Sequence, residues 1–212
     1  MKAVLFDFDG TLTVATLDFG LMRQRTLEAL APFSEEPFRP GAMIVEEIER
    51  VTAALGAQEA ERAVRAAYGA IEAVELEAAE RSSLLPFVRP MFAALMERGI
   101  AIAIITSNFP AAVFKVFPDL ASFTGCILTR NDVARVKPHP AHLEAALARL
   151  GVAPEHALMV GDHPSDVLAG KRANTRTAGV ASGGSSLDAL AQEGPDYLAR
   201  DAGELMRLLG IV

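Results

Sequence analysis

The sequence predicts an α/β protein whose core is a doubly wound, Rossmann-like parallel sheet with an inserted α-helical subdomain. Three observations support this fold class. Short apolar runs alternate with helical segments from residue 86 to the end, as in parallel sheets covered by helices on both faces. A further apolar run, Ala3–Phe8, lies at the N-terminus. The intervening residues 14–85 show only helical periodicity.

The strands expected in the core are short apolar runs. Ala3–Phe8 is the first, broken by Asp7, and the run IAIAII at 100–105 has the continuous apolar character of a strand buried on both faces. The remaining strands are expected at 125–129, 157–161, 175–180 and, as a short one, at Tyr197-Leu198. Helices are expected between them, at about 88–98, 110–122, 140–150, 164–172 and 187–192, and after the last strand.

Residues 14–85 differ from the rest of the chain in both pattern and charge. They hold 13 acidic and 7 basic side chains, so −6 of the total net charge of −7 lies in this segment. Two apolar stripes at helical spacing predict helices that pack within it: Ile44, Ile48, Val51 and Leu55 in one, and Val64, Ala67, Ile71 and Val74 in the other. We therefore expect a core domain over 1–13 and 86–212, and a helical bundle over 14–85.

Composition excludes several classes of protein. Hydrophobic residues make up 51% of the 212 residues, which favours a folded chain over a disordered one. The single cysteine, Cys126, supports neither a disulfide framework nor a thiolate metal site. No apolar run approaches the roughly 18 residues that span a bilayer, and Asp7 comes too early for a secretory signal. Because the acidic balance disfavours nucleic acid and no segment suits a membrane, we expect a soluble cytoplasmic protein.

Polar side chains gather where the expected strands end. Asp7, Asp9 and Thr11 follow the first strand, and Thr106, Ser107 and Asn108 follow the run IAIAII. Lys137 lies beyond the strand at 125–129. Asp162, His163 and Asp166 follow the strand at 157–161. Since open parallel sheets bind ligands beyond the carboxyl ends of their strands, these side chains are expected to form one active site.

These residue types suit chemistry on a phosphate group. Asp7, Asp9 and Asp162 offer hard oxygen ligands of the kind that Mg²⁺ prefers. Lys137 and the donors of Thr106–Asn108 suit phosphate oxygens, so that a metal ion and a lysine would neutralise charge during phosphoryl transfer. One carboxylate can act as nucleophile and another can move a proton. Gly10 permits a tight turn, and the hydroxyl of Thr11 can bond within it.

Four short motifs carry a family resemblance. DFDGTLT (7–13), TSN (106–108), KP (137–138) and GDHPSD (161–166) resemble, in order and spacing, the four motifs of the haloacid dehalogenase superfamily. The resemblance covers the whole chain and is closest to the branch of phosphoglycolate-phosphatase-like enzymes, in which a helical cap lies between the first and second motifs. It implies that residues 14–85 form this cap.

The resemblance also implies a role for each motif residue. Asp7 would be the nucleophile and a Mg²⁺ ligand, and Asp9 the general acid and base, whose main-chain carbonyl also binds the metal. Thr106, Ser107, Asn108 and Lys137 would bind the transferring phosphoryl group. Asp162 would be the second carboxylate ligand of Mg²⁺, and Asp166 would position a water molecule on the metal. Thr11 would support the first loop, and His163, which stands where serine is commoner, would lie near the phosphate or the water around the metal.

Departures within the superfamily narrow the activity. Dehalogenases lack the second aspartate, so Asp9 favours a phosphatase. Phosphonate-cleaving relatives use a lysine of the cap, and this cap has none. The resemblance therefore implies a Mg²⁺-dependent phosphomonoesterase that acts on a small phosphorylated metabolite through an aspartyl-phosphate.

Two alternatives stay open at this stage. A phosphotransferase or phosphomutase needs the cap to hold a second anion, for which Arg23 or Arg25 is available. A receiver-type signalling module also uses acidic residues, a hydroxyl and a lysine, but it carries no 72-residue helical insertion and its phosphorylated aspartate is expected after a middle strand. Nothing in the sequence marks an oligomeric interface.

The other histidines and the segment Ser182–Ser186 are interpreted without a catalytic role. His139, His142 and His156 are expected on the surface. Residues Ser182–Ser186 (SGGSS) are expected to form a flexible loop at the edge of the site, because they lack the lysine of a phosphate-binding loop.

Overall fold

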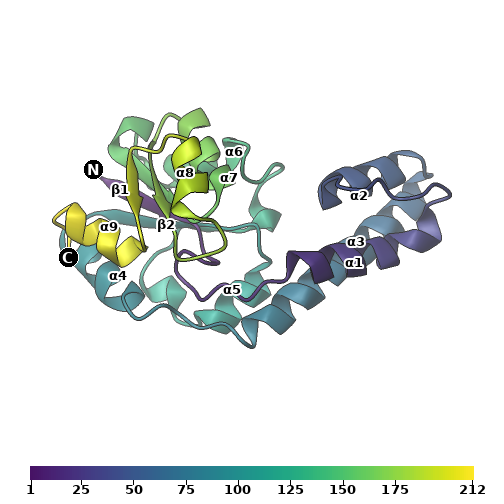
Figure 1. Ribbon diagram of the computed structural model, residues 1–212, viewed down its shortest axis with the longest axis horizontal. Helices are drawn as coiled ribbons and strands as arrows, with labels where there is room; N and C mark the ends of the chain where they lie inside the picture. The colour runs from purple at the N-terminus through teal and green to yellow at the C-terminus, as the bar shows by residue number, and fades with distance from the viewer. The chain divides into compact units, whose positions relative to one another are not determined.

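Six parallel strands form the sheet of the larger of two units in the computed structural model, which describes residues 1–212 (Figure 1). This unit comprises Met1–Thr16 and Arg81–Val212. The strand order is β3-β2-β1-β4-β5-β6. The strands are β1 (Ala3–Phe6), β2 (Ala101–Ile105), β3 (Ile127–Leu128), β4 (Ala157–Gly161), β5 (Arg176–Val180) and β6 (Tyr197–Ala199). The predicted α/β class and parallel sheet are confirmed, although β3 is shorter than the expected 125–129.

Helices cover both faces of this sheet because side chains alternate along each strand. Val4 and Phe6 of β1 pack in a cluster with α4 (Val88–Glu97), α5 (Pro110–Val116) and α9 (Ala202–Leu208). Ala3 and Leu5 pack in a second cluster with α6 (Ala141–Leu150) and α7 (Pro164–Arg172). The short helix α8 (Leu187–Gln192) packs against β5 and β6. Short 3-10 turns complete this unit: η2 (Leu120–Ser122), η3 (Arg130–Asp132) and η4 (Pro154–His156).

Residues Leu17–Glu80 form the second unit, which contains only helices. Its elements are α1 (Phe19–Leu30), the 3-10 turn η1 (Ala31–Phe33), α2 (Ile44–Ala53) and α3 (Ala57–Ala79). Ile48 and Val51 of α2 are buried, as the apolar stripe predicts. The predicted apolar stripe of α3 is wrong at its first residue. Val64 is 36% exposed, and Ala63 is buried in its place. The small side chains of Ala63 and Ala67 allow close packing within this unit.

A buried carboxylate with two arginine partners lies within the helical unit. The carboxylate of Glu47 on α2 is fully buried and contacts Nε of Arg39 at 2.5 Å and an amino nitrogen of Arg50 at 2.9 Å. Burial on its own would raise the pKa of Glu47, but the hydrogen bonds and charges of Arg50 and Arg39 outweigh it and lower the pKa. Both oxygens of this carboxylate are therefore compensated, as a buried charge requires.

The segments that leave and re-enter the sheet unit pair with each other. Val14 N–H donates to the carbonyl of Ser83 at 2.9 Å, and Leu85 N–H donates to that of Leu12 at 2.9 Å. Thr13 and Leu84 form an antiparallel bridge between these two bonds. No helix of the chain has the combination of length and apolar character that a membrane crossing requires.

Candidate active site

Three central strands direct acidic and hydroxyl side chains to the carboxyl edge of the sheet. Asp7 follows β1, Thr106 follows β2 and Asp162 follows β4, and these strands are neighbours in the sheet. The main chain continues the pairing for one residue beyond the strands, since Asp7 N–H donates to the carbonyl of Val160 and Thr106 N–H to that of Leu128. The expected convergence of the strand ends therefore occurs, and all three side chains are buried or nearly so.

Lys137 bridges two of the predicted acidic residues. Its ammonium nitrogen lies 2.5 Å from Oδ1 of Asp7 and 2.7 Å from Oδ1 of Asp166, and its side chain is only 5% exposed. Burial opposes the charge on Lys137, but the charges of Asp166 and Asp7 outweigh it and raise the pKa of the lysine. The lysine is therefore a fixed positive charge between Asp7 and Asp166.

Asp162 and Asp7 share the hydroxyl of Thr11. Oγ1 of Thr11 lies 3.3 Å from Oδ1 of Asp162 and 3.4 Å from Oδ2 of Asp7. One carboxylate oxygen from each of Asp7, Asp162 and Asp166 lies within 4.8 Å of the others. Burial and the charges of Asp7 and Asp166 raise the pKa of Asp162 to about 7. Crowded carboxylates of this kind, with oxygen donors alone, fit a hard divalent cation such as Mg²⁺.

Asp166 is held by other groups in this cluster. Its Oδ1 contacts Lys137, and its Oδ2 accepts a hydrogen bond from the main-chain N–H of His163 at 3.0 Å. Burial raises the pKa of Asp166, although the charge of Lys137 opposes this effect. Since both oxygens already have donors, the contacts suit a residue that orients Lys137 and the start of α7.

Asp9 lies beside the loop that follows β2. The side-chain amide of Asn108 donates a hydrogen bond to Oδ2 of Asp9, and the hydroxyl of Thr13 lies 3.5 Å from Oδ1. Burial, and then the charge of Asp7, raise the pKa of Asp9 to about 6, while the bond from Asn108 opposes the rise. A carboxyl group with a pKa in this range can both give and accept a proton near neutral pH.

The loop Thr106–Asn108 is fixed by contacts from two directions. The hydroxyl of Thr106, which is 1% exposed, accepts a hydrogen bond from Asn108 N–H at 3.1 Å. Arg130, in η3, donates from Nε to the carbonyl of Ser107, and its guanidinium carbon lies 4.9 Å from the ring centre of Phe109. Sequence reasoning missed Arg130, which has no motif around it and reaches the site only because β3 is the neighbour of β2.

His163 caps the helix that follows it. Nδ1 of its imidazole lies 3.2 Å from the main-chain nitrogen of Ser165 and 2.9 Å from its hydroxyl oxygen, at the first turn of α7. The side chain is exposed. These contacts make His163 the N-cap residue of α7.

Residues Ser182–Gly184 contact the site directly. Gly184 N–H donates to Oδ2 of Asp162 at 3.0 Å, and the hydroxyl of Ser182 donates to the carbonyl of Gly10 at 2.7 Å. The sequence placed this loop only at the edge of the site. The position of this loop directly after a strand could have indicated a direct contact. That inference requires the strand order, in which β5 lies next to β4.

The prediction that His142 lies on the surface is wrong. His142 is fully buried on α6, and its Nε2 lies 3.1 Å from the carbonyl of Leu128. Nδ1 is buried without a hydrogen-bond partner. Burial, and then the charge of Lys137, lower the pKa of His142 to about 4, so that the ring is neutral. His139 is half-buried and accepts from Ala141 N–H at the start of α6, whereas His156 is exposed as expected.

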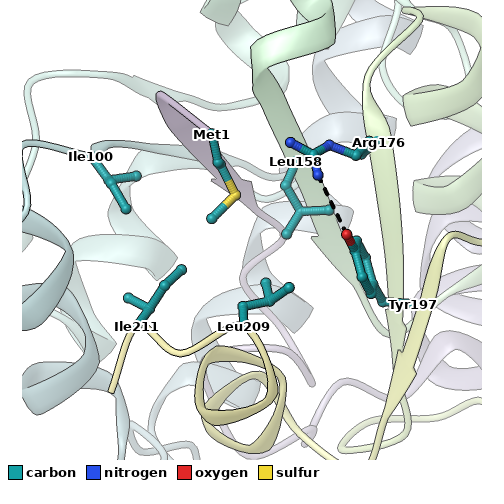
Figure 2. Close-up of a pocket in the computed structure, with 7 residues that line it drawn as sticks. All are labelled: Met1, Ile100, Leu158, Arg176, Tyr197, Leu209 and Ile211. Carbon is teal, nitrogen blue, oxygen red and sulfur yellow. Dashed lines mark hydrogen bonds between the residues drawn. The ribbon is translucent and has the colours of Figure 1, made fainter.

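A separate hollow of about 290 Å³ lies at the opposite, amino-terminal edge of the sheet (Figure 2). Apart from Arg176 and Tyr197, whose side chains form a 3.4 Å hydrogen bond, its walls are apolar. It is lined by Met1, Ile100, Leu158, Arg176, Tyr197, Leu209 and Ile211. None of these residues belongs to the carboxylate cluster, so the hollow offers no chemistry comparable to that at the carboxyl edge.

The fold and the site together define an enzyme of the doubly wound class with its acidic centre at the carboxyl edge of the sheet. A family model described as haloacid dehalogenase-like hydrolase matches residues 1–174. The chain is 33% identical over 226 residues to the pyrophosphatase PpaX of Anoxybacillus flavithermus, in an alignment that spans 100% of this chain and 98% of that protein. The chain therefore belongs to the haloacid dehalogenase-like hydrolases, and the predicted family is confirmed.

Two further similarities agree with this assignment. The phosphoglycolate phosphatase of Escherichia coli is 29% identical over 137 residues, which span 63% of this chain and 54% of that protein. The crystal structure of a hydrolase from Pseudomonas syringae matches 100% of this chain and 99% of its own with a TM-score of 0.73 and 23% identity, which supports the fold. The prediction of an enzyme with phosphatase relatives is confirmed at the level of the family.

Proposed function

We propose that the chain is a cytoplasmic, Mg²⁺-dependent phosphomonoesterase that acts on a small organic phosphate through an aspartyl-phosphate. The observation that carries the proposal is the contact of Lys137 with Asp7 beside Asp162 and Asp9. In the proposed roles, these residues are a nucleophile, a phosphate-binding cation, a metal-ligating carboxylate and a proton donor at one edge of the sheet. Phosphate-ester cleavage through a phosphorylated aspartate can use these four functions together.

The metal would be held by Asp7 and Asp162, with the main-chain carbonyl of Asp9 as a third ligand. When bound, Mg²⁺ would neutralise charge on the phosphoryl oxygens and on the carboxylates around it. The oxygen-only donor set and the raised pKa of Asp162 support a divalent cation at this position. Asp166 would act on the site through Lys137, which it contacts at 2.7 Å.

In the first step, a carboxylate oxygen of Asp7 attacks phosphorus and the bond from phosphorus to the ester oxygen breaks. Asp9, in its protonated form, gives its proton to the leaving oxygen, which departs as an alcohol. Lys137 and the hydroxyl and amide donors of Thr106–Asn108 stabilise the charge on the equatorial oxygens. The products of this step are the alcohol and a mixed anhydride between Asp7 and phosphate.

The second step returns the enzyme to its starting state. Asp9, now ionised, accepts a proton from a water molecule while the oxygen of that water attacks phosphorus. The bond between phosphorus and the carboxylate oxygen of Asp7 breaks, which releases inorganic phosphate. The hydrogen bond from Asn108 holds the carboxylate of Asp9 in one orientation through both steps.

The names of two relatives support the proposed substrate class. They are a pyrophosphatase and a phosphoglycolate phosphatase. We propose that residues 14–85 act as a cap that sets the choice among such molecules, as enzymes often use a mobile segment for this purpose. Lys137 and the metal, and not the net charge of −6 on this segment, would supply the attraction for the anion.

The phosphotransferase alternative has less support in the structure. Arg23 donates to the main-chain carbonyls of Ala42 and Arg39, and Arg25 pairs with Glu77 at 2.5 Å. Both guanidinium groups therefore stabilise the helical unit itself. They were the residues on which a second anion site depended, so we retain hydrolysis as the proposal.

A panel assay tests the proposal. The purified chain is incubated with 2-phosphoglycolate, pyrophosphate, sugar phosphates and p-nitrophenyl phosphate, with Mg²⁺ or with excess EDTA, and phosphate release is ranked by kcat/KM. We expect release that requires Mg²⁺ and falls by roughly 10³-fold or more in Asp7→Asn. Release that persists in EDTA, or in Asp7→Asn, would contradict the proposal. Product phosphate that appears only on an added acceptor would support transfer instead.

A further inference from the structure

The carboxylate of Asp162 lies between two glycine residues from different loops. A Cβ atom at Gly183 would lie 1.9 Å from Oδ2 of Asp162 and 2.9 Å from Cα of Gly10. A Cβ atom at Gly10, where φ is +74°, would lie 2.6 Å from the same Oδ2. Both distances are far inside van der Waals contact, so only glycine at each position lets the two loops approach this carboxylate so closely.

Hydrogen bonds fix the loop in this position. Gly184 N–H donates to Oδ2 of Asp162 at 3.0 Å, and the hydroxyl of Ser182 ties the same loop to the carbonyl of Gly10 at 2.7 Å. The loop Ser182–Gly184 follows β5, whereas Gly10 belongs to the turn after β1. Two loops that flank Asp162 are therefore joined to each other and to one of its oxygens.

The two oxygens of Asp162 consequently have different surroundings. Oδ2 lies against the loop Ser182–Gly184 and accepts the hydrogen bond from Gly184 N–H. Oδ1 lies 3.3 Å from the hydroxyl of Thr11, which also lies 3.4 Å from Oδ2 of Asp7. Rotation of the carboxylate is restricted on the Oδ2 side by the backbone of Gly183, so that Oδ1 is kept on the side of Asp7.

We propose that the loop Ser182–Gly184 positions Asp162 for the metal ion, by holding Oδ2 so that Oδ1 is directed toward Asp7. This inference rests on the proposed function, because it assumes that Asp7 and Asp162 share Mg²⁺. It assigns Ser182, Gly183 and Gly184 as positioning residues. A ligand that is held in place before the ion arrives loses less conformational entropy when the ion binds.

Two glycines provide a matched pair of variants. Gly183→Ala puts a methyl group into the carboxylate, and the backbone of Gly10 limits how far the loop can retreat. Gly125→Ala, at an exposed position outside the site, adds a methyl group with no atom within 4 Å. Mg²⁺ affinity is measured on each full-length variant by calorimetric titration. We expect roughly 10- to 100-fold weaker Mg²⁺ binding in Gly183→Ala and a change of less than about two-fold in Gly125→Ala.

Activity and stability give two further readouts. Phosphate release by Gly183→Ala should recover toward the wild-type kcat at high Mg²⁺, since its ligands are all present. The melting temperature of each variant in EDTA reports whether the fold itself has changed. If Gly183→Ala does not fold, Ser182→Ala replaces it, because this variant removes the bond to Gly10 and adds no atoms. Its Mg²⁺ affinity should fall several-fold, in line with the loss of one hydrogen bond.

The outcomes separate this inference from the function on which it rests. Wild-type affinity for Mg²⁺ in a folded Gly183→Ala, or in Ser182→Ala where that variant replaces it, overturns the positioning role. Equal weakening in Gly183→Ala and Gly125→Ala overturns it as well. Both results leave the Mg²⁺-dependent phosphatase intact. A wild-type chain that binds no Mg²⁺, or that releases phosphate equally well in EDTA, overturns the proposed function and this inference with it.

Discussion

The ammonium group of Lys137 lies 2.7 Å from Oδ1 of Asp166, and both side chains are almost fully removed from solvent, at 5% and 2% exposure. Neither charge could be buried alone, because the cost of desolvating an unpaired ion is several kcal/mol. Asp166 therefore keeps Lys137 charged and in place, while the other contact of the lysine is with Asp7, the proposed nucleophile.

Removal of the charge at residue 166 tests this relationship. In Asp166→Asn, Lys137 keeps one carboxylate partner and loses its fixed orientation, so kcat/KM for phosphate release should fall by about 10- to 100-fold. Asp188→Asn, at an exposed position in the first turn of α8, is the control and should have wild-type kinetics. Equal kinetics for the two variants would show that Lys137 does not depend on Asp166.

The hydrogen bond from Asn108 should set the pH range of activity. Burial and the charge of Asp7 raise the pKa of Asp9 to about 6, and the bond from Asn108 opposes them. In Asn108→Ala the pKa of Asp9 should therefore rise further. In the proposed mechanism Asp9 donates its proton in the first step, so kcat/KM should fall above this pKa. The basic limb of the profile should therefore move to higher pH in Asn108→Ala.

Profiles of kcat/KM between pH 5 and 9 measure this shift. Asn131 is an exposed residue of η3, so Asn131→Ala serves as the control. The basic limb of its profile should lie at the same pH as in the wild type. A limb that moves to lower pH in Asn108→Ala would contradict the assignment of Asn108 as the donor to Asp9.

The buried imidazole of His142 should make the fold sensitive to acid. Its pKa is lowered to about 4, against about 6.5 for an ordinary histidine. As pH falls from about 6.5 to 4, the unfolded chain takes up a proton that the folded chain does not. The contribution of this residue to stability is thus fully present above pH 6.5, and on the order of 3 kcal/mol is lost by pH 4.

A comparison of two glutamine variants isolates this effect. His142→Gln retains a donor for the carbonyl of Leu128 but does not titrate, so urea denaturation should show a weaker loss of stability between pH 6.5 and 4 than in the wild type. His156→Gln, at an exposed position, should follow the wild-type curve. Identical curves for His142→Gln and the wild type would rule out the buried neutral ring as the cause.

Glu47 should make the helical unit depend on Arg50. Arg50→Met leaves the fully buried carboxylate with Arg39 as its remaining partner, and the free energy of unfolding should fall by about 2 kcal/mol. Arg65→Met removes an exposed pair with Glu61 and should cost no more than about 0.5 kcal/mol. Urea denaturation of both variants at pH 7 gives the comparison, and equal losses would contradict a special role for the buried carboxylate.

The sheet could be predicted from the sequence because its signals are local. Each run of alternating or continuous apolar residues, such as Ala101–Ile105, is buried as a strand, and the polar residue after it marks the carboxyl edge. The motif residues Asp7, Thr106 and Asp162 needed no more than this to be placed together. Strand β3 was overestimated, since only Ile127-Leu128 pair with β2.

The remaining features depend on contacts between distant segments. The polarity of His142 suggested a surface position, and only the packing of α6 against the sheet shows that its ring is buried. Gly183 and Arg130 reach the site because of the strand order, which alternation of strands and helices does not specify. The division into a core over 1–13 and 86–212 and a cap over 14–85 stays a prediction, as do the roles of the individual site residues.

The pairing of residues 12–14 with 83–85 has a consequence for how such a chain can diversify. Because Val14 and Ser83 are hydrogen-bonded neighbours, everything between them leaves and returns at nearly one point. A few glycine and serine residues could join these positions without moving a strand of the sheet. The helical segment could therefore differ in length or sequence without a change in the course of the strands that carry the carboxylates.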